Sequence, residues 1–360
     1  MRVLHLDAAE EWRGGQTQLR LLLQHVPGIH GVMLPKDAPL RAALLQDGAR
    51  ICGDLPHGWL ASPRPLKQAI TLFEPDLLAA HTPQAHAVAV RAAGTLPVIV
   101  HRRVDFTPGS SVLTRARYRA SQGYVCVSEA VRRVLVDYGV PPERTVVVRD
   151  GVEVGAHRPD PEGAARLRAS LGLSSSTLAI GAVGALVPHK GHRVLIEAMA
   201  RLRVHRPDVV ALIAGEGKER RSLQAQIDRL GAPVRLLGQL SANEVRALHG
   251  AIELLVHPSL EEGLGQAVIE GMAAGVPVIA SRAGGLPEVV RQGETGRLVP
   301  PDHPALLAET LHQALLATSE GQRMAREART MVRHELSADR MAQRTVHAYA
   351  QLCRLAASGA

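Results

Sequence analysis

Short apolar runs alternate with longer segments of helical periodicity along most of the chain. In the first part these runs are continuous rather than alternating, and they cover 3–6, 32–34, 76–80, 98–100, 124–127 and 146–149. The helical segments between them cover 16–25, 40–47, 65–73, 84–93 and 129–138. Continuous apolar strands separated by helices are typical of a parallel sheet covered on both faces. The pattern therefore predicts a doubly wound α/β sheet with right-handed crossovers.

The same alternation returns in the second part after a break. Beyond Asp150-Gly151 the sequence GVEVGAHRPDPEGAARLRASLGLSSS is rich in Pro, Gly and Ser, and strands are then expected at 178–183, 209–214, 234–237, 254–256 and 276–279. We expect a first domain at 1–155, a linker with one short helix at 156–175, a second domain at 176–340 and a C-terminal helix at 341–360. Two doubly wound α/β domains facing each other would form a cleft at the carboxyl ends of their strands.

Composition limits the function classes. A chain of 360 residues exceeds the size of most single cores, which agrees with two domains. Apolar residues make up 46% of the chain but aromatic residues only 2%, so Leu, Val, Ile and Ala must fill the interior. Little aromatic surface is left to stack on bases, and we expect no nucleic-acid partner.

The sequence shows no clear sign of export, of a membrane span or of disulfide bonding. The N-terminus, MRVLHLDAAEEW, has too short an apolar run for a signal peptide and predicts a first strand instead. No apolar run reaches the roughly 18 to 20 residues that span a bilayer. Three separated cysteines, Cys52, Cys126 and Cys353, argue against a disulfide framework and a zinc site. These features predict a cytoplasmic protein.

The formal charge is +8 and comes mainly from arginine. One local concentration follows His101 and consists of Arg102, Arg103, Arg115, Arg117 and Arg119. A basic surface of this kind suits an anionic membrane leaflet or a phosphorylated acceptor. The alternative is a general arginine bias with solvated helix faces.

The most specific candidate functional residues lie in residues 257–281, the stretch HPSLEEGLGQAVIEGMAAGVPVIAS. A buried strand is followed by a loop and then by a predicted helix at 264–274. Gly263, Leu264 and Gly265 would let a ligand approach the helix N-terminus, where free amides and the helix dipole favour a phosphate. Glu262 lies on the loop and Glu270 inside the helix, on opposite sides of that end.

This layout suits a nucleotide sugar laid across the helix N-terminus, since carboxylates accept hydrogen bonds from vicinal hydroxyls. Two alternatives remain at this point. In one, Glu262 neighbours the helix cap and Glu270 is a solvated helix residue. In the other, the two carboxylates act as the acid and base of a glycosidase, although a phosphate site between them explains the glycines better.

These residues also carry a family resemblance. The run EEGLGQAVIEGMAAGVPVIASRAGGLPEVV resembles the signature of family 4 retaining glycosyltransferases, whose two glutamates fall on Glu262 and Glu270. The match extends to Gly14-Gly15, to VSEAVRRVLVDYGVPPERTVVVRDGVE, to GALVPHKGH and to AGEGKER. The resemblance implies the GT-B fold, with two Rossmann-like domains, a nucleotide held mainly by the C-terminal one and no metal.

The resemblance implies roles for single residues. Lys190 would contact the donor diphosphate, Glu262 the donor sugar and Glu270 the ribose. Gly14 and Gly15 would lie against the phosphates and the acceptor. His101 is similar in position to a histidine near the reacting sugar, so it joins Glu262 and Lys190 as a catalytic candidate; the alternative is a strand-end histidine with a structural hydrogen bond.

The sequence also departs from the family pattern. Ala185 stands where an arginine usually helps the lysine neutralise the diphosphate, which leaves His189 or an arginine elsewhere to supply the charge. Asp150 replaces a common Asn, and Gly271 replaces a common Ala at a cost of about 1 kcal/mol of helix propensity.

We expect a retaining transferase that moves a hexose from a nucleoside diphosphate sugar, its only co-substrate, to a glycan or lipid-linked acceptor of the cell envelope, such as lipopolysaccharide or polysaccharide. Peripheral binding to the inner face of the plasma membrane is part of this expectation. A sugar-nucleotide epimerase of the same fold and a non-catalytic nucleotide-sugar binding protein are the alternatives.

Overall fold

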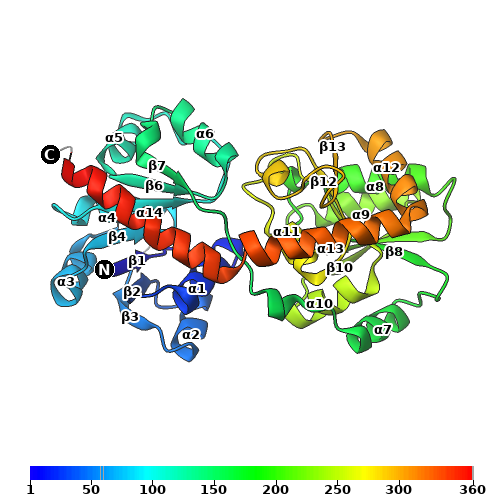
Figure 1. Ribbon diagram of the computed structural model, residues 1–360, viewed down its shortest axis with the longest axis horizontal. Helices are drawn as coiled ribbons and strands as arrows, with labels where there is room; N and C mark the ends of the chain where they lie inside the picture. The colour runs from blue at the N-terminus through cyan, green and yellow to red at the C-terminus, as the bar shows by residue number, and fades with distance from the viewer. Residues whose placement is uncertain (57, 60, 359–360) are drawn as a thin grey trace. The chain divides into compact units, whose positions relative to one another are not determined.

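The computed structural model describes residues 1–56, 58–59 and 61–358. Its contacts divide the chain into two compact units (Figure 1). The first unit comprises Met1–Gly151 together with Ala338–Ala360, and the second comprises Val152–Ser337. The chain therefore leaves the first unit after Gly151 and returns to it at Ala338.

The first unit is built on a parallel sheet. Within the described residues the sheet has seven strands in the order β3-β2-β1-β4-β5-β6-β7. They are β1 (Arg2–Leu6), β2 (Ile29–Leu34), β3 (Arg50–Asp54), β4 (Leu77–Ala80), β5 (Val98–Arg102), β6 (Gly123–Cys126) and β7 (Thr145–Val147). Each neighbouring pair is parallel, which requires a crossover between consecutive strands.

Helices supply these crossovers. They are α1 (Gly14–His25), α2 (Pro39–Gln46), α3 (Arg64–Phe73), α4 (Pro83–Ala92), α5 (Val112–Ala120) and α6 (Glu129–Asp137), with the short turn η1 (Pro142–Arg144) before β7. The C-terminal helix α14 (Ala338–Ser358) returns to this unit because Tyr349 and Leu352 are buried in its core, beside Val3 and Ile99.

The second unit repeats the architecture. Its described residues form a six-stranded parallel sheet in the order β10-β9-β8-β11-β12-β13. The strands are β8 (Leu178–Val183), β9 (Val209–Ala214), β10 (Val234–Gly238), β11 (Leu254–His257), β12 (Val278–Ser281) and β13 (Arg297–Val299). Its helices are α7 (Pro161–Ser170), α8 (His192–Leu202), α9 (Arg220–Leu230), α10 (Ala242–Ala251), α11 (Gln266–Ala274), α12 (Pro304–Leu316) and α13 (Thr318–Glu335), with the short turns η2 (Val154–His157), η3 (Pro188–Lys190) and η4 (Leu286–Glu288).

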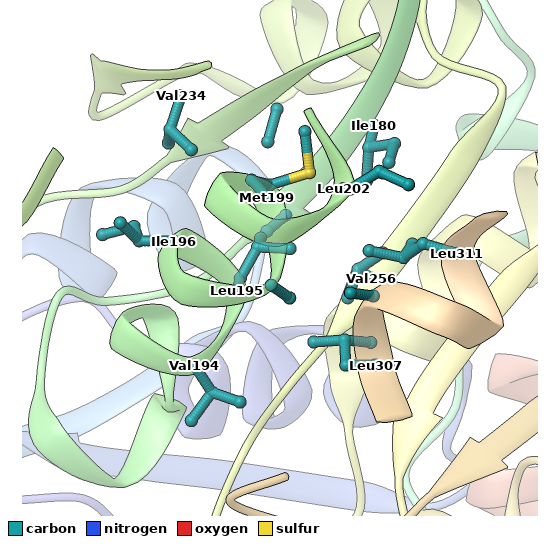
Figure 2. Close-up of a cluster of buried hydrophobic side chains, with 14 of the residues drawn as sticks. Ile180, Val194, Leu195, Ile196, Met199, Leu202, Val234, Val256, Leu307 and Leu311 are labelled. Atoms are coloured by element: carbon teal, nitrogen blue, oxygen red, sulfur yellow. The ribbon is translucent and has the colours of Figure 1, made fainter. Parts of the chain in front are cut away.

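The core of the second unit is aliphatic, as the composition predicts. Leu195 and Met199 of α8 pack with Ile180 of β8 and Val256 of β11, and Leu311 of α12 joins them (Figure 2). Every tryptophan, tyrosine and phenylalanine of the chain lies in the first unit. Intrinsic fluorescence therefore reports on the first unit alone.

The prediction of two doubly wound α/β sheets is confirmed. The strands that the sequence pattern missed, β3 and β13, lie at sheet edges, where RICGD and RLV carry too few apolar residues to form a recognisable run. Helix α5 was also missed, because Tyr118 is its one buried residue and no apolar periodicity results.

The segment expected as a linker, 156–175, has a different place in the structure. It contains α7, which packs extensively against α10. Asp160 caps α7 by accepting a hydrogen bond from the amide of Gly163 at 2.9 Å, and Ala164 is buried. The segment is therefore part of the second unit and not a linker.

Two features of the fold bear on function. In each sheet the strand order reverses once, between β1 and β4 and between β8 and β11, and doubly wound sheets bind ligands at the carboxyl ends of the strands beside such a point. Among the helices of the described chain, none has the length and apolarity to cross a bilayer.

Candidate functional site

Lys190 lies at the carboxyl end of β8, beside the reversal of strand order in the second unit. It closes the turn η3, and Gly191 follows with φ of +66° before α8 begins at His192. A Cβ on Gly191 would lie 2.0 Å from the carbonyl oxygen of Pro258. Only glycine allows this close approach, so the loop after β8 lies directly against the loop after β11.

Glu262, on the loop after β11, is the centre of a polar cluster. Its Oε2 accepts hydrogen bonds from Lys190 Nζ at 2.5 Å, from His257 Nε2 at 2.7 Å and from Ser259 Oγ at 3.3 Å. The side chain is 12% exposed. Three donors on one oxygen fix the carboxylate and leave the other oxygen, Oε1, for a further partner.

The electrostatics of Glu262 favour its charged form. Burial raises the pKa of Glu262, but the hydrogen bond and charge of His257, followed by the charge and hydrogen bond of Lys190, outweigh burial and hold the pKa well below its usual value. Glu262 is therefore a carboxylate at neutral pH, suited to accepting hydrogen bonds rather than to giving up a proton.

The backbone around Glu262 is fixed from two sides. The amide of Leu260 donates to the carbonyl of His189 at 2.7 Å, and the amide of Gly285 donates to the carbonyl of Glu262 at 2.9 Å. Gly284 has φ of +50°, and a Cβ there would lie 1.9 Å from that same carbonyl oxygen. The loops after β8, β11 and β12 thus meet at the carboxyl ends of these strands. Their mutual contacts hold Lys190 and Glu262 in place when no ligand is bound.

Helix α11 begins beside this cluster, two residues later than the sequence predicts and with the predicted end. Gly265 precedes it with φ of +102°, no side chain caps its N-terminus, and Gly275 ends it in the left-handed conformation. The predicted phosphate-binding residues Gly263, Leu264 and Gly265 form the approach to this end. A nine-residue helix directs its N-terminal amides and the positive end of its dipole there.

Glu270 lies one turn into α11. Its Oε1 accepts a hydrogen bond from Gln266 Nε2 at 3.2 Å, and burial raises its pKa to about 7. The two predicted carboxylates therefore differ: Glu262 is ionised and is held by Lys190 and His257, whereas Glu270 holds or loses a proton near neutral pH. This difference argues against the solvated-helix alternative for Glu270.

The loop that contains Ala185 lacks an arginine at that position, as the sequence indicated, and Ala185 is exposed. The amide of Leu186 donates to the carbonyl of Glu216 at 2.9 Å, and the amide of Glu219 donates back to Leu186 at 3.0 Å. This pairing brings the loop after β9, with the exposed Lys218, against the Ala185 loop. Arg220 is already paired with Glu216 at 2.7 Å.

Comparisons with known proteins agree with this geometry. Residues 37–155 match the family model described as Glycosyltransferase Family 4, and residues 164–331 match the model described as Glycosyl transferases group 1. The MMP alpha-(1->4)-mannosyltransferase of Mycolicibacterium hassiacum is 31% identical over 330 residues, which cover 90% of this chain and 77% of that protein. The chain belongs to glycosyltransferase family 4.

Other curated proteins similar to this chain are also glycosyltransferases. The D-inositol 3-phosphate glycosyltransferase of Corynebacterium efficiens is 33% identical over 199 residues, 52% of this chain. The chain spans about half the length of such curated relatives, 46% in this case. The crystal structure of Anabaena HepE in complex with UDP and glucose superposes with a TM-score of 0.86 at 25% identity, covering 97% of this chain and 99% of that one. The GT-B fold is thereby confirmed.

The predicted glycine loop, Gly14-Gly15, lies in the first unit. Gly14 and Gly15 open α1, and neither has another atom within 4 Å of a Cβ placed on it. Behind them the buried Asp7 accepts hydrogen bonds from the amide of Ala9 at 2.8 Å and from Gln16 Nε2 at 3.0 Å. The loop therefore has a rigid base and an open front, as contact with a ligand requires.

His101, the third catalytic candidate, is buried at the end of β5. Its Nε2 is 2.6 Å from the hydroxyl of Tyr349, and its ring stacks on His81 at 4.3 Å between centroids. Burial, and next the charge of Arg103, lower its pKa well below the usual value. These are the contacts of the structural alternative, and the catalytic role of His101 stays a prediction.

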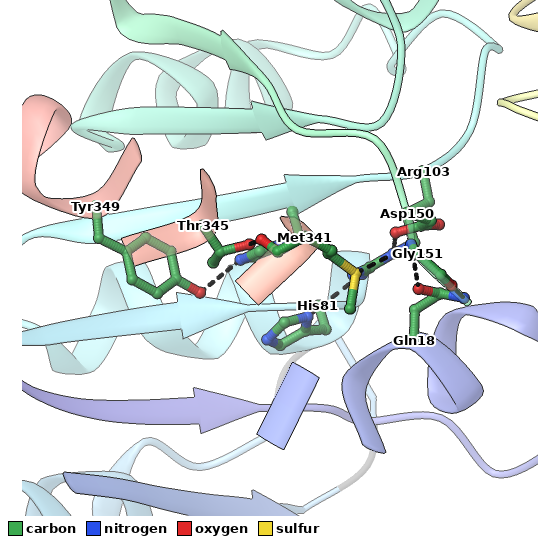
Figure 3. A network of polar contacts seen from close by, with 9 residues as sticks. Gln18, His81, Arg103, Asp150, Gly151, Met341, Thr345 and Tyr349 are labelled. Carbon is green, nitrogen blue, oxygen red and sulfur yellow. Dashed lines mark hydrogen bonds and ion pairs between the residues drawn. The ribbon is translucent and has the colours of Figure 1, made fainter. Parts of the chain in front are cut away.

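The five arginines predicted to form a basic surface separate into two groups. Arg102 is buried and donates to the carbonyl of Phe106 and to Tyr118 Oη. Arg103 lies between Asp150 Oδ1, at 3.1 Å, and His81 Nδ1, at 3.3 Å (Figure 3). Arg102 and Arg103 are thus internal, which corrects the prediction, whereas Arg115, Arg117 and Arg119 lie on α5.

His257 and Ser259 were not predicted as site residues. His257 ends β11 and Pro258 follows it. In the sequence this pair indicates only the end of a buried strand and does not point to a functional residue. The signal available in the sequence was position alone: both residues directly precede Glu262 on a loop at the carboxyl end of a central strand. Only the folded structure shows that both side chains donate a hydrogen bond to the same oxygen of Glu262, Oε2.

Proposed function

We propose that this chain transfers a hexose from a nucleoside diphosphate sugar to an acceptor hydroxyl with retention of the anomeric configuration. The observation that carries the proposal is the Lys190–Glu262 pair beside the N-terminus of α11 at the strand-order reversal of the second unit. One ammonium, one ionised carboxylate and one helix dipole suit a diphosphate joined to a polyhydroxyl group.

Each residue has a role in the proposed reaction. Lys190 has three donors, so it can bind diphosphate oxygens while one N–H stays on Glu262. Glu262 Oε1 would accept a hydrogen bond from a sugar hydroxyl and orient the ring. The amides at the start of α11 would stabilise the charge on the departing diphosphate, and Glu270 would bind the ribose hydroxyls.

The bond changes balance without an enzyme nucleophile. The bond between the anomeric carbon and the β-phosphate oxygen breaks, and the diphosphate leaves with the electron pair. The acceptor oxygen attacks on the same face, and its proton passes to the departing phosphate oxygen. Nothing beyond the two substrates is consumed, and the protein contributes charge and orientation.

The acceptor class is inferred from the relatives and from charge. The names of the relatives include D-inositol 3-phosphate glycosyltransferase and phosphatidylinositol monomannoside mannosyltransferase, so an acceptor that carries phosphate or lipid is part of the proposal. The acceptor would belong to a glycolipid, lipopolysaccharide or polysaccharide of the cell envelope. It would reach the protein at the inner face of the plasma membrane, near the first unit.

A donor panel tests the proposal. UDP-, GDP- and ADP-sugars are incubated with the protein, and release of nucleoside diphosphate is followed with and without extracts of envelope acceptors. Acceptor-dependent release from one donor, with an α-linked product from an α-linked donor by NMR, is the expected result. An epimerised donor without diphosphate release would identify an epimerase, and binding of a donor that is never consumed would identify a binding protein; either result would refute transfer.

A further inference from the structure

Helix α5 exposes apolar side chains that its unit does not cover. Val112 and Leu113, in its first turn, are 82% and 83% exposed. A surface helix of a globular protein normally turns such residues toward the core. Here Tyr118 takes the buried position instead, so the aliphatic pair faces away from the first unit.

Two exposed aromatic side chains adjoin the same helix. The Arg117 guanidinium lies over the ring of Trp59 at 5.0 Å, and Trp59 is 52% exposed. Phe106, 57% exposed, lies under the Arg102 guanidinium at 4.8 Å, and Arg102 in turn reaches Tyr118 Oη at 3.3 Å. Cation–π contacts thus hold both rings, Trp59 on Arg117 of α5 and Phe106 on Arg102 at the end of β5. We call Trp59, Phe106, Val112 and Leu113, with Arg115, Arg117 and Arg119, the α5 patch.

The charge of the α5 patch has one sign. Helix α5 contains three arginines and no acidic residue. Arg115 and Arg119 are exposed. An occupant of this surface must therefore combine anionic groups with an apolar layer.

We infer that the α5 patch docks the first unit onto an anionic lipid bilayer. Exposed aliphatic and aromatic side chains enter the boundary between headgroups and acyl chains, while arginines stay at the headgroup phosphates. Each arginine near such a surface increases binding several-fold. A nucleic acid would match the charge but not the aliphatic pair, and is therefore an outcome of the test. This inference rests on the proposed function only for its purpose, which is to bring the protein to a membrane-held acceptor.

The experiment uses the full chain and vesicles of defined composition. Trp12→Phe leaves Trp59 as the single tryptophan of the chain, so its emission reports on the α5 patch. We expect a blue shift with phosphatidylglycerol-containing vesicles, quenching by brominated acyl chains, weakening by salt and no response to pure phosphatidylcholine.

Two double variants separate charge from apolar insertion. Arg115→Glu with Arg119→Glu should lower the partition coefficient at least roughly 30-fold. Val112→Ser with Leu113→Ser should abolish the blue shift and leave donor hydrolysis unchanged. The matched controls are Arg326→Glu with Arg333→Glu, on exposed positions of α13, and Leu72→Ser with Val204→Ser, which are 72% and 74% exposed.

The outcomes are distinct. The inference is overturned if wild-type protein does not bind anionic vesicles, if the control variants lose binding as strongly as the patch variants, or if the patch variants lose binding to single-stranded DNA but not to vesicles. Vesicle binding in a protein that consumes no donor would refute the proposed function and leave the docking surface intact.

Discussion

Lys190 Nζ lies 2.5 Å from Glu262 Oε2, although 72 residues separate the two side chains in the sequence. The pair joins the loops after the two strands at which the order of the second sheet reverses. Each residue restrains the other before a donor arrives, so little orientation remains to be lost on binding. The predictions below start from this pair.

Loss of the Lys190 ammonium should remove most of the turnover. Lys190→Ala is expected to lower kcat/KM by about 10²- to 10³-fold, since a positioned group that stabilises a departing anion contributes about 3 to 4 kcal/mol. Glu262→Ala should be as damaging because the sugar loses its hydrogen-bond acceptor. Donor turnover is measured by diphosphate release, and circular dichroism checks that the fold survives. Lys67→Ala, at an exposed position of α3, is the control; wild-type turnover in either site variant would refute the assignment.

His257 should act on turnover by positioning Glu262. His257→Leu removes a donor from the 2.7 Å hydrogen bond and should lower kcat by about 10- to 100-fold, the range of a single charge-assisted hydrogen bond. His257→Gln keeps an N–H donor and should recover part of that loss. Because the nucleotide does not depend on this contact, inhibition by the nucleoside diphosphate should stay near the wild-type value in both. Equal kcat in wild type and His257→Leu would contradict the positioning role.

Glu270 links stability to pH in an unusual direction. Burial raises its pKa to about 7 from a usual 4.5, so the unfolded chain releases the proton near pH 4.5 and the folded chain only near pH 7. The free energy of unfolding should therefore fall between pH 4.5 and 7, by at most about 3 kcal/mol. Glu270→Gln should flatten this fall, as urea titrations at pH 5 and pH 8 would show, and calorimetry should find weaker donor binding. Unchanged donor affinity would argue against the ribose role.

An arginine at position 185 should strengthen donor binding. Ala185 is exposed on the loop beside Lys190, and an added guanidinium can pair with diphosphate oxygens. Ala185→Arg is expected to lower the donor KM by roughly tenfold, about 1.4 kcal/mol. Ala165→Arg, at an exposed position of α7, carries the same charge change elsewhere and should have no effect. A loss of binding would mean that another cation, such as Lys218, already occupies that position.

The buried histidines should make the first unit sensitive to acid. Burial is the main cause that lowers the pKa of His5, His81 and His101 well below 6.5 and the pKa of His86 to about 3. Below pH 6.5 the unfolded chain takes up protons that the folded chain does not, so stability is lost as pH falls, by up to about 5 kcal/mol per pH unit for four groups. Tryptophan fluorescence in urea follows this unit alone. His81→Gln should reduce the slope by about a quarter, and His347→Gln, exposed on α14, is the control.

The sequence by itself determined the fold class and indicated candidate donor residues. Continuous apolar runs separated by amphipathic segments allow few architectures besides doubly wound sheets. Glycines 263 and 265 around a helix start indicated an anion site, since local spacing decides which backbone can approach a phosphate. Glu262 and Glu270 were predicted from this spacing, whereas Lys190 came from the resemblance to family 4, and the roles of all three residues stay predictions.

Only the tertiary structure decided how these groups are held. The hydrogen bond of His257 to Glu262, the return of α14 to the first unit and the burial of Arg102 all depend on contacts between distant segments. Charge in a sequence does not reveal exposure, because an arginine can be internal when a buried partner satisfies it, as Asp150 does for Arg103. The exposure of Val112 and Leu113 on α5 could not be predicted either, because a short helix with one buried residue leaves no periodic signal in its sequence.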